Sequence, residues 1–508
     1  MPDAEVLIIG AGPTGLVLAH WLVRLGVNIR IIDKAAEPGT TSRALVVHAR
    51  TLEFYRQLGL ADAVVQQALK LGAINVWARG RKAGRAVFGP LGEGMSPFPY
   101  LLIHPQDQHE RLLIERLAAL GVQVERNTEL LGFEQDAAAG GVMARLRRPD
   151  GTETSLQALW LAGCDGARST VREVLGAGFQ GSTYSHLFYV ADIEASGPVM
   201  DGEPHVNLDE SDFVVVFPLK GAGRARLIGT IRREPKDEGD VLTWDDVGQD
   251  VLSRLEIAVE QVNWFSTYRV HHRVADRFRW NRAFLLGDAA HIHSPVGGQG
   301  MNTGIGDAVN LGWKLAAVVQ GRAAPSILDT YEAERIAFAR RLVATTDRAF
   351  TVVTNTSPIA RFVRVELVPR VLPLLFASRS VRRLMFRTVS QIAIEYRSSP
   401  LSEGRAGKVS GGDRLPWVPG DNFEPLASLD WQVHVYGTAG HAIADRCARR
   451  DLALHVFPWE SAAARAGLEK NAVYLVRPDG YVALADATGS TDRLEGYLDT
   501  RGLKPRGR

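Results

Sequence analysis

The sequence contains few of the residues that build metal sites and disulfide frameworks. Only two of its 508 residues are cysteines, Cys164 and Cys447, and neither a CxxC pair nor a Cys/His cluster occurs. This argues against structural zinc and against a disulfide framework, so no metal site is predicted. The same cysteine usage is typical of proteins in a reducing compartment, and we expect a cytoplasmic location.

Charge of one sign and long apolar runs are scarce as well. The formal net charge is +2 and no block of Lys and Arg stands out, which argues against nucleic acid as a partner. The first apolar run, Val6–Ile9, follows acidic residues and is too short for a signal peptide. No uninterrupted apolar run reaches about 18 residues, so no membrane span is predicted. With 46% hydrophobic and 23% charged residues, the chain is typical of a globular protein of two or three domains.

A glycine-rich turn follows the first predicted strand. The apolar run Glu5–Ile9 is typical of a buried parallel strand, and Leu16–Leu22 predicts a helix. Between them, Gly10 permits a tight turn, Gly12 lets the backbone approach a pyrophosphate, and Gly15 lets the helix pack on the strand. The N-terminus of such a helix presents unpaired N–H groups and a partial positive charge to phosphates. The pattern predicts a dinucleotide-binding unit.

An acidic residue closes the next predicted strand. Val27–Ile32 follows Gly26 and leads into Asp33. A carboxylate about 20 residues beyond the glycines can accept hydrogen bonds from an adenosine ribose. This unit alone does not distinguish NAD from FAD.

A second phosphate-approaching segment lies far along the chain and points to FAD. Ala283–Asp288 is predicted to be a strand that ends in an acid suited to a ribityl hydroxyl, and a glycine-rich loop leads from it to Asn302. Ile305–Val319 is predicted to be a long helix. Its N-terminus and the glycine amides would point at the pyrimidine edge of an isoalloxazine and stabilise an anionic reduced flavin. Two segments so far apart can hold the two ends of one long cofactor, which favours FAD.

Two further segments contain candidate phosphate or capping residues. Arg43 and Arg50 can each neutralise a diphosphate with two hydrogen bonds, although Arg50 is equally well explained as a solvated residue of a first helical turn. Leu159–Arg172 has the pattern of a strand, a tight turn and a helix start, in which Asp165 can cap the helix.

Three of these motifs, in this order, resemble those of the single-component FAD-dependent aromatic hydroxylases, also called group A flavin monooxygenases or the para-hydroxybenzoate hydroxylase class. The motifs are Gly10–Gly15, Cys164–Gly166 and Gly287–Asn302, and Asp307–Leu315 and Tyr331–Arg335 are also similar. The resemblance is strong over residues 4–345 and looser beyond them. Within the class, the chain is most similar to 3-(3-hydroxyphenyl)propionate hydroxylase-like and polyketide hydroxylase-like members, which carry a thioredoxin-like C-terminal domain.

The resemblance implies an α/β fold with several parts. A Rossmann-like FAD-binding domain would comprise residues 1–180 and 270–345, interleaved with a β-sheet substrate-binding domain at 181–269. Connecting helices would occupy 346–410, and a thioredoxin-like α/β domain 411–508. In this last part the sequence predicts strands at 431–436, 452–458, 473–477 and 481–485 and helices at 441–450 and 492–500. Gly437–Gly440 stands where thioredoxin has its CxxC, so redox exchange is excluded and a role in packing or assembly is expected.

The resemblance also assigns cofactor contacts by motif match. The three glycines of the first turn would hold the pyrophosphate, and Asp33 the adenosine ribose, where family members more often have Glu. Asp165 would lie near both the flavin diphosphate and the incoming nicotinamide cofactor. A helix cap is the alternative role for the segment around Gln106. The phosphates and the ribityl chain would contact Arg43, Gln106 and Asp288, the isoalloxazine would contact Gly298, Gln299, Gly300, Met301 and Asn302, and further FAD contacts would be Pro13, Thr14, Lys34, Leu130 and Pro295.

The activity that the resemblance implies is an oxygen-dependent hydroxylation. NADPH or NADH would dock transiently, since no second GxGxxG occurs, and would reduce FAD. Molecular oxygen would then form a flavin C4a-hydroperoxide that attacks a phenolic or polycyclic aromatic substrate. Baeyer–Villiger oxidation or epoxidation by the same fold is an alternative, and a non-catalytic flavin-binding protein is a second one. A homodimer is left open.

The sequence does not assign a catalytic base. His271, His272 and Arg273 are candidates for acid–base chemistry, but a histidine pair of this kind is more often structural. Aromatic residues of the middle region either line the substrate cavity or belong to the core of its sheet: Phe188, Tyr189, Phe213 and Phe217.

Arginines recur among Leu, Val and Phe in Ser357–Tyr396. This pattern is typical of an amphipathic membrane helix or of connecting helices. Pro369, Pro373 and the position between domains favour connecting helices.

Overall fold

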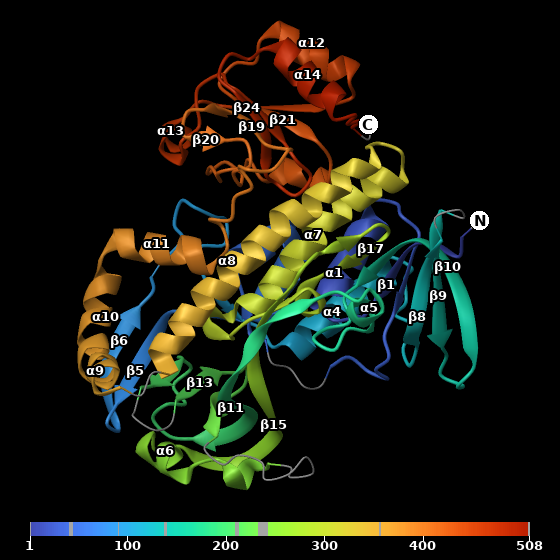
Figure 1. Ribbon diagram of the computed structural model, residues 1–508. Coiled ribbons are helices and arrows are strands. Elements are labelled where there is room, and N and C mark those ends of the chain that lie inside the picture. The colour runs from blue at the N-terminus through green and yellow to red at the C-terminus, as the bar shows by residue number, and fades with distance from the viewer. Residues whose placement is uncertain are drawn as a thin grey trace.

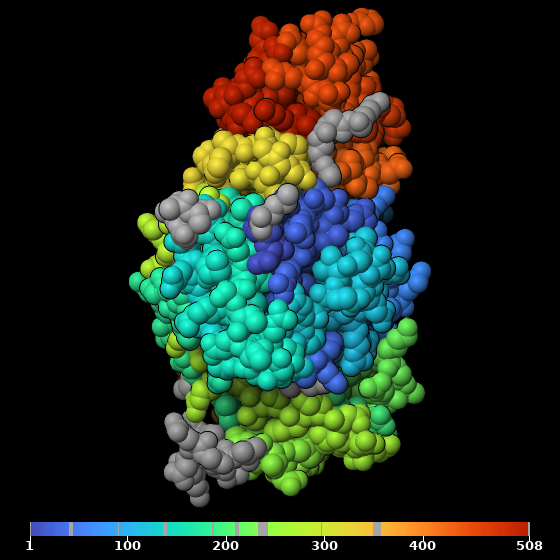
Figure 2. Space-filling view, turned by 90° about the vertical axis from the view of Figure 1, so that its right-hand side faces the viewer, coloured from blue at the N-terminus to red at the C-terminus, as the bar shows by residue number. Residues whose placement is uncertain are grey.

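The computed structural model describes residues 2–39, 44–89, 91–136, 140–208, 213–231, 242–354 and 357–505. Three large sheets succeed one another along an elongated molecule, with the C-terminal sheet at one end and an eight-stranded sheet at the other (Figure 1). The long helices α7 (Gln299–Val319) and α8 (Asp329–Thr354) run between them. In Figure 2 the C-terminal part forms the narrow end of the molecule.

The first sheet contains the predicted dinucleotide-binding unit. Its strands β17, β10, β1 and β2 are parallel and adjacent in that order, and the helix after the first strand, α1 (Pro13–Arg24), packs on α7. The register places Ile9 beside both Gly163 and Ile32, and Gly163 beside Leu285. Because parallel strands end at one edge, the turns that follow them meet there. The seven strands are β1 (Ala4–Ile9), β2 (Ile29–Ile32), β8 (Glu129–Asp136), β9 (Gly141–Arg147), β10 (Glu153–Gly163), β16 (Arg279–Trp280) and β17 (Ala283–Leu285).

The eight-stranded sheet extends beyond the predicted range 181–269. Its two longest strands, β11 and β15, are paired and continue to Phe179 and Ala275, and a hairpin from the N-terminal part of the chain forms the far edge of the sheet. That hairpin joins through β5, which pairs in parallel with β12. Pairing over such a sequence distance leaves no local signal. The strands are β5 (Ala73–Ala78), β6 (Arg81–Val87), β11 (Phe179–Ser196), β12 (His205–Asn207), β13 (Val214–Pro218), β14 (Arg224–Ile231), β15 (Ala258–Ala275) and β18 (His291–Ile292).

The C-terminal sheet confirms the elements predicted for this region. A parallel β–α–β unit is followed by an antiparallel hairpin and a last helix, and the strand order is β22-β21-β23-β24, with β19 and β20 added at the β24 edge. The elements are β19 (Glu403–Ala406), β20 (Val409–Ser410), β21 (Gln432–Tyr436), α12 (His441–Arg449), β22 (Ala453–Phe457), α13 (Ser461–Ala466), β23 (Val473–Val476), β24 (Val482–Asp486) and α14 (Thr491–Thr500).

Helices cover and connect these sheets. The segment predicted to connect them, residues 346–410, is largely helical up to Val389, and its proline Pro373 lies inside α10. The prediction is wrong for the end of this segment, because β19 and β20 belong to the C-terminal sheet. Among the described residues, none of the helices has both the length and the apolar character needed to cross a membrane. The remaining elements are α2 (Ala49–Gln57), α3 (Ala61–Gln67), α4 (Gln106–Ala119), α5 (Thr170–Val174), α6 (Gln249–Arg254), α9 (Pro358–Phe362), a π-helical turn (Val363–Leu367), α10 (Val368–Ala377), α11 (Arg379–Val389) and a small sheet of β3 (Val46–Val47), β7 (Leu102–Ile103) and β4 (Leu69–Lys70). Short 3₁₀ turns lie at Trp244–Asp246, Gly287–Ala289, Val296–Gly298, Pro325–Leu328 and Glu424–Ser428.

The predicted start of α7 is wrong by six residues. The helix was expected to begin at Ile305, but it begins at Gln299, so the last four residues of the expected loop to Asn302 are helical. Glycines lower helix propensity there, yet close packing requires them. A Cβ atom at Gly304 would overlap the hydroxyl of Thr14, and one at Gly306 would press on the guanidinium of Arg335.

Candidate functional site

Two glycines of the first turn are required by packing, and the third faces open space. Gly10 has φ +98°, and a Cβ atom there would overlap the carbonyl oxygen of Cys164. A Cβ atom at Gly15 would overlap the carbonyl oxygen of Gly10. At Gly12, by contrast, a Cβ atom would meet nothing within 4 Å. The turn therefore packs tightly on β10 and α1 and leaves room for a ligand beside Gly12.

The N-cap residue of α1 has no side chain that could cap the helix. Gly12 is the N-cap residue, Pro13 follows it, and the first turn contains no acidic residue. Within the described parts of the chain, no side chain caps the first N–H groups of the helix. Such a terminus attracts an anion, so the structure fits the pyrophosphate of a dinucleotide here.

Asp33 lies against this turn. Its carboxylate accepts hydrogen bonds from the N–H groups of Ala11 (2.7 Å) and Ala35 (2.8 Å), and about a fifth of the side chain is exposed. The next residue, Lys34, is exposed, whereas Leu130 is buried at the start of the neighbouring β8. The carboxylate thus stays accessible at the end of β2, where a ribose would lie.

The turn after β10 confirms the capping interpretation of Asp165. Its carboxylate accepts from the hydroxyl of Ser169 (2.6 Å) and from the N–H of Val171 (3.1 Å), at the start of α5. Burial raises the pKa of Asp165. Arg172 then donates to the carbonyls of Ala167 (2.7 Å) and Ala289 (3.1 Å), which ties this turn to the one after β17.

The turn after β17 is held in place by a hydrogen bond to Asp307 of α7. The carboxylate of Asp307, on α7, accepts from the N–H of Gly287 (3.0 Å), from His291 Nε2 (2.7 Å) and from Arg335 Nε (2.6 Å). Burial favours the neutral acid, but Arg335 and His291 outweigh it and lower the pKa of Asp307. Asp288 itself is exposed, at the same sheet edge as the glycine turn.

At the start of α7, the backbone N–H groups are more available to a ligand than the side chains are. Gly297 and Gly298 both have left-handed φ values, +77° and +62°, and no side chain among the described residues caps the helix. The side chain of Asn302 binds the N–H of His48 (3.0 Å) and the carbonyl of Val46 (2.9 Å). Gln299 likewise donates to a carbonyl of the connecting helices (2.9 Å). Side chains at these two predicted flavin contacts therefore hold the protein together, and the N–H groups remain for a ligand.

The other residues predicted at this end have mixed outcomes. Gln106 is the first residue of α4, whose N-cap is Pro105, so its side chain does not cap the helix; it accepts from the N–H of Ala44 (3.3 Å) and donates to Glu110 (2.8 Å). Arg43 lies outside the described residues. Pro295 is exposed, and Gly300 and Met301 are half-buried in the first turn of α7.

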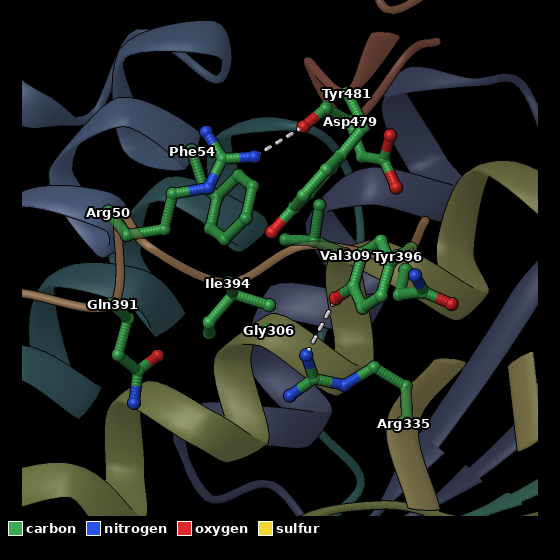
Figure 3. Close-up of a pocket in the computed structure, with 11 residues that line it drawn as sticks. Arg50, Phe54, Gly306, Val309, Arg335, Gln391, Ile394, Tyr396, Asp479 and Tyr481 are labelled. Atoms are coloured by element: carbon green, nitrogen blue, oxygen red, sulfur yellow. Dashed lines mark hydrogen bonds between the residues drawn. The ribbon is translucent and has the colours of Figure 1, made fainter. Parts of the chain in front are cut away.

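Arg50 is not the solvated first-turn residue that the sequence allowed. It is buried, pairs with Glu53 (2.9 Å) and donates to the carbonyl of Asp479 (2.7 Å) in the C-terminal part. Figure 3 shows its guanidinium beside Phe54 and Tyr481, in a small cavity between α2, α7 and the β23–β24 turn. Arg50 therefore belongs to an internal junction.

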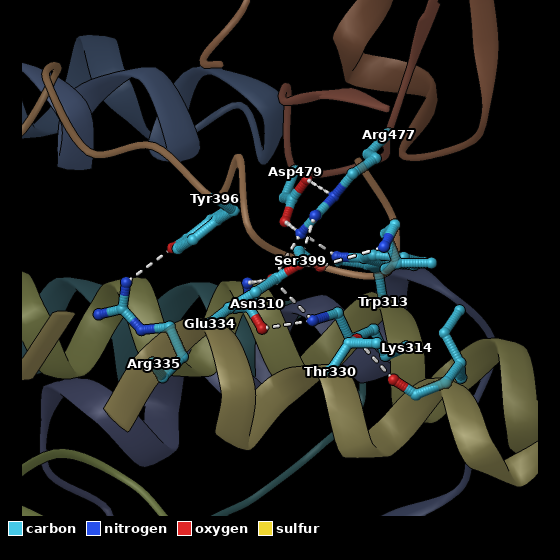
Figure 4. Close-up of polar contacts among 12 residues, drawn as sticks. Asn310, Trp313, Lys314, Thr330, Glu334, Arg335, Tyr396, Ser399, Arg477 and Asp479 are labelled. Atoms are coloured by element: carbon cyan, nitrogen blue, oxygen red, sulfur yellow. Dashed lines mark hydrogen bonds and ion pairs between the residues drawn. The ribbon is translucent and has the colours of Figure 1, made fainter. Parts of the chain in front are cut away.

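A network of buried charges joins the same C-terminal turn to α7 and α8 (Figure 4). Arg477 donates to Glu334 (2.7 and 3.0 Å) and to Asp479 (2.6 and 3.0 Å), and Lys314 donates to Glu334 (2.9 Å). The indole N–H of Trp313 donates to Asp479 (3.0 Å). Burial lowers the pKa of Lys314 to about 8, while Arg477 and Lys314 overcome burial and hold the pKa of Glu334 well below its usual range.

Two histidines beside the start of α7 were not singled out from the sequence. His48 Nε2 donates to the carbonyl of Gly298 (3.1 Å), and His293 Nδ1 donates to the carbonyl of Ser294 (2.8 Å). The second nitrogen of each ring is buried and has no hydrogen-bond partner within the described parts of the chain. Burial lowers the pKa of both side chains to about 4. Each ring therefore presents an unused acceptor nitrogen. The sequence did contain a signal for both histidines, because His48 lies two residues before Arg50 and His293 lies two residues before Pro295, a predicted flavin contact.

The three catalytic candidates lie on β15, which pairs with β18. His271 contacts the hydroxyl of Thr183 (2.7 Å), and His272 contacts that of Ser182 (2.8 Å). Arg273 pairs in register with Ile292 of β18. Their catalytic role stays a prediction.

The eight-stranded sheet presents two different faces. Phe188 packs with Val270 and Phe213 on one face, whereas Tyr189 packs on Phe265 and Trp244 on the other. Neighbouring strands place Phe217 on the same face as Phe188. There Phe217 packs with residues that adjoin β3 and β7, on the side of His48. Tyr189 is therefore core, and the other three aromatics lie on the opposite face of the sheet, the one that adjoins β3 and β7.

Comparison with known proteins agrees with this geometry. A family model described as an FAD binding domain matches residues 3–346. The chain is 35% identical over 541 residues to 6-methylpretetramide 4-monooxygenase of Streptomyces rimosus, with 99% of this chain and 95% of that protein covered. It is 32% identical over 425 residues to pentachlorophenol 4-monooxygenase of Sphingobium chlorophenolicum, with 82% of this chain and 76% of that protein covered.

A solved structure shows the same architecture. The anhydrotetracycline hydroxylase of Streptomyces rimosus superposes with a TM-score of 0.79 and 29% identity, over 99% of each chain. The three turns at one sheet edge, the family match and these full-length relatives lead to one conclusion: the chain belongs to the FAD-dependent aromatic monooxygenases of group A.

Proposed function

We propose that this enzyme holds FAD along the edge where β1, β2, β10 and β17 end. The free N–H groups of α1 beside Gly12 bind the pyrophosphate, and Asp33 binds the adenosine ribose. Asp165, positioned at the cap of α5, and Asp288, on the adjoining turn, flank the diphosphate and the ribityl chain. The observation that carries this proposal is the space beside Gly12 in front of an uncapped helix N-terminus.

The isoalloxazine would lie at the start of α7. The two left-handed glycines turn the backbone so that N–H groups of the first helical turn face the ring, and the helix dipole favours negative charge there. When bound, FAD supplies the electron transfer and oxygen activation of the reaction. The unused nitrogens of His48 and His293 would accept hydrogen bonds from the flavin ring or from a phenol hydroxyl. Their low pKa values make them acceptors rather than strong bases.

NADPH or NADH serves as the transient electron donor in this proposal, and O2 as the oxidant. The sequence contains no second GxGxxG turn, so the nicotinamide cofactor would dock without a dedicated Rossmann unit. The two free thiols, Cys164 and Cys447, agree with a reducing cytoplasm. A homodimer is compatible with these parts. We propose the division into domains 1–180 with 270–345, 181–269, 346–410 and 411–508, with β5, β6 and β18 added to the substrate sheet and with β19 and β20 moved from the connecting part to the C-terminal part.

The proposed substrate is a phenolic, polycyclic aromatic compound. The relatives named above include enzymes of methylpretetramide and anhydrotetracycline. The face of the sheet that adjoins β3 and β7 is aromatic and aliphatic, with Phe188, Phe213 and Phe217 on it. It also carries an ion pair between buried Arg226 and half-buried Asp192 (2.6 and 2.7 Å), the type of polar contact that orients a ligand in an apolar cavity.

Activity is tested by NAD(P)H oxidation and oxygen uptake across phenols, tetracyclic phenols and polycyclic quinones, with product mass. A product heavier by one oxygen atom supports hydroxylation. A lactone from a ketone substrate would assign Baeyer–Villiger oxidation instead. Absence of stimulated oxidation across the panel by the FAD-loaded protein would refute the substrate class.

The cofactor site is tested with a matched pair of glycine variants. Gly12→Ala fills the space beside the α1 terminus, and Gly440→Ala makes the same change at the N-cap of α12, where a Cβ atom also meets nothing within 4 Å. Both variants should fold like the wild type. We expect FAD affinity, measured by flavin fluorescence, to fall at least about tenfold in Gly12→Ala only, because a methyl group displaces a pyrophosphate contact. Equal affinity in both variants would refute the placement.

A further inference from the structure

Large apolar side chains are exposed mainly in one segment of the chain. Of the twelve such side chains found exposed among the described residues, seven lie between residues 357 and 389, in α9, the π-helical turn, α10 and α11. These helices form an outer edge of the molecule beside β5 and β6 (Figure 1). The seven are Ile359 (78% exposed), Phe362 (63%), Val363 (37%), Leu367 (47%), Leu374 (73%), Leu375 (45%) and Leu384 (67%).

The exposed side chains follow a helical stripe. Along the first helices, one side is buried against the protein, as at Val365, Pro369 and Phe376, where Phe376 packs on Phe88 of the segment after β6. Ile359, Val363, Leu367 and Leu374 recur at intervals of four, four and seven residues on the other side. Positions with this spacing share one helix face. The apolar stripe therefore points away from the enzyme.

The charge of the segment is strongly positive. Residues 357–389 contain seven arginines and a single acidic residue, Glu366, which gives a net charge of +6. The whole chain has a net charge of +2, so the rest of it carries −4. Glu366 is already paired with Arg79 (2.6 Å) and Arg370 (2.8 Å), and the adjoining hairpin adds exposed Arg81 and Lys82. Positive charge is thus concentrated around the apolar stripe.

We propose that this surface, α9–α11 with the tip of the β5–β6 hairpin, binds the surface of an anionic phospholipid membrane without spanning it. Apolar side chains on one helix face with arginines beside them enter the boundary between headgroups and acyl chains, and the arginines contact the lipid phosphates. A second copy of the chain fits poorly, because a symmetric contact would bring together two surfaces that each carry a net positive charge. The proposal does not depend on where FAD binds.

Vesicle co-sedimentation of the FAD-loaded full chain tests the proposal. Binding should be at least about tenfold stronger to phosphatidylcholine vesicles containing phosphatidylglycerol than to phosphatidylcholine alone, and it should weaken from about 0.1 to 1 M salt. Arg383→Gln with Arg387→Gln should lower the partition coefficient roughly fivefold per arginine. Leu374→Ser with Leu384→Ser should lower it as well, since the leucines supply the apolar contact.

Two controls separate this proposal from other occupants. Val456→Ser removes a similarly exposed apolar side chain (51%) from the C-terminal sheet and should leave vesicle binding unchanged. Absence of binding to anionic vesicles at low salt would overturn the proposal. Self-association in sedimentation velocity that disappears in Leu374→Ser with Leu384→Ser would also overturn it and assign the surface to a second copy.

Discussion

Two regions of this molecule that contain basic side chains differ in how their charges are compensated. At the junction of α7, α8 and the C-terminal turn, Arg477 and Lys314 face Glu334 and Asp479, and all four side chains are at most 1% exposed. Along α9–α11, seven arginines accompany one glutamate and leucines stay exposed. A charge is tolerated in the interior only when it is paired and hydrogen-bonded. The first region is therefore an internal joint, and the second remains a surface.

The largest expected effect tests whether the joint depends on complete pairing. Arg477→Met leaves Glu334 and Asp479 buried without their shared guanidinium. We expect a loss of about 3–5 kcal/mol in the free energy of unfolding, measured by urea denaturation. Arg383→Gln, on α11, is the control and should change stability by less than about 0.5 kcal/mol. Similar losses in both variants would erase the distinction between the two regions.

The pH dependence of stability sharpens the comparison. The pKa of Lys314 is about 8 in the folded protein and about 10.5 when unfolded, so below pH 8 both states are protonated and burial of the charge costs stability in full. Between pH 8 and 9.5 the unfolded state holds the proton that the folded state has released, and stability should rise. Lys314→Met should lack this rise in the midpoint of urea unfolding. A parallel pH profile for the two proteins would contradict the assignment.

A smaller effect tests whether the internal joint influences FAD binding at the proposed site. Arg335 binds Asp307, which holds the Gly287 turn, and its other end donates to the hydroxyl of Tyr396 (2.8 Å), whose ring packs on Tyr481 (4.5 Å). Tyr396→Phe removes one hydrogen bond and keeps the ring. We expect FAD to bind about three- to tenfold more weakly, measured by flavin fluorescence.

The control for this variant is Tyr474→Phe. Tyr474 also has a buried hydroxyl, which donates to the carbonyl of Ala406 (3.2 Å) and accepts from the N–H of Glu469 (2.8 Å), both in the C-terminal part and away from α8. Tyr474→Phe should lose at least as much stability as Tyr396→Phe and keep its FAD affinity. If FAD affinity falls equally in both variants, the effect of Tyr396 is general destabilisation.

The smallest expected effect is on the surface region. Leu384→Ser removes an apolar side chain that is 67% exposed, so the free energy of unfolding should change by less than about 0.5 kcal/mol in urea denaturation. A loss above about 1.5 kcal/mol would show that this leucine is part of a packed interface within the chain.

Short sequence patterns predicted much of the candidate site. The run from Glu5 to Gly15 and the acid at Asp33 predicted a strand, a turn, a helix and a ribose ligand position, because period, glycine and helix-terminus chemistry act over a few residues. Secondary structure in the C-terminal part was predicted for the same reason. The start of α7 was not, since its glycines oppose a helix locally and are required only by packing against Thr14 and Arg335.

What the sequence by itself determined is the family chemistry: two glycine-rich turns and two acids whose spacing selects an FAD-binding fold. Only the tertiary structure decided the fate of individual polar side chains. Arg50 is part of a buried junction, and the side chains of Gln299 and Asn302 form hydrogen bonds within the protein. His48 and His293 each have a buried ring nitrogen without a hydrogen-bond partner among the described residues. The physical reason is that pairing and desolvation depend on partners that lie up to several hundred residues away in the chain, as Asp479 lies from Arg50.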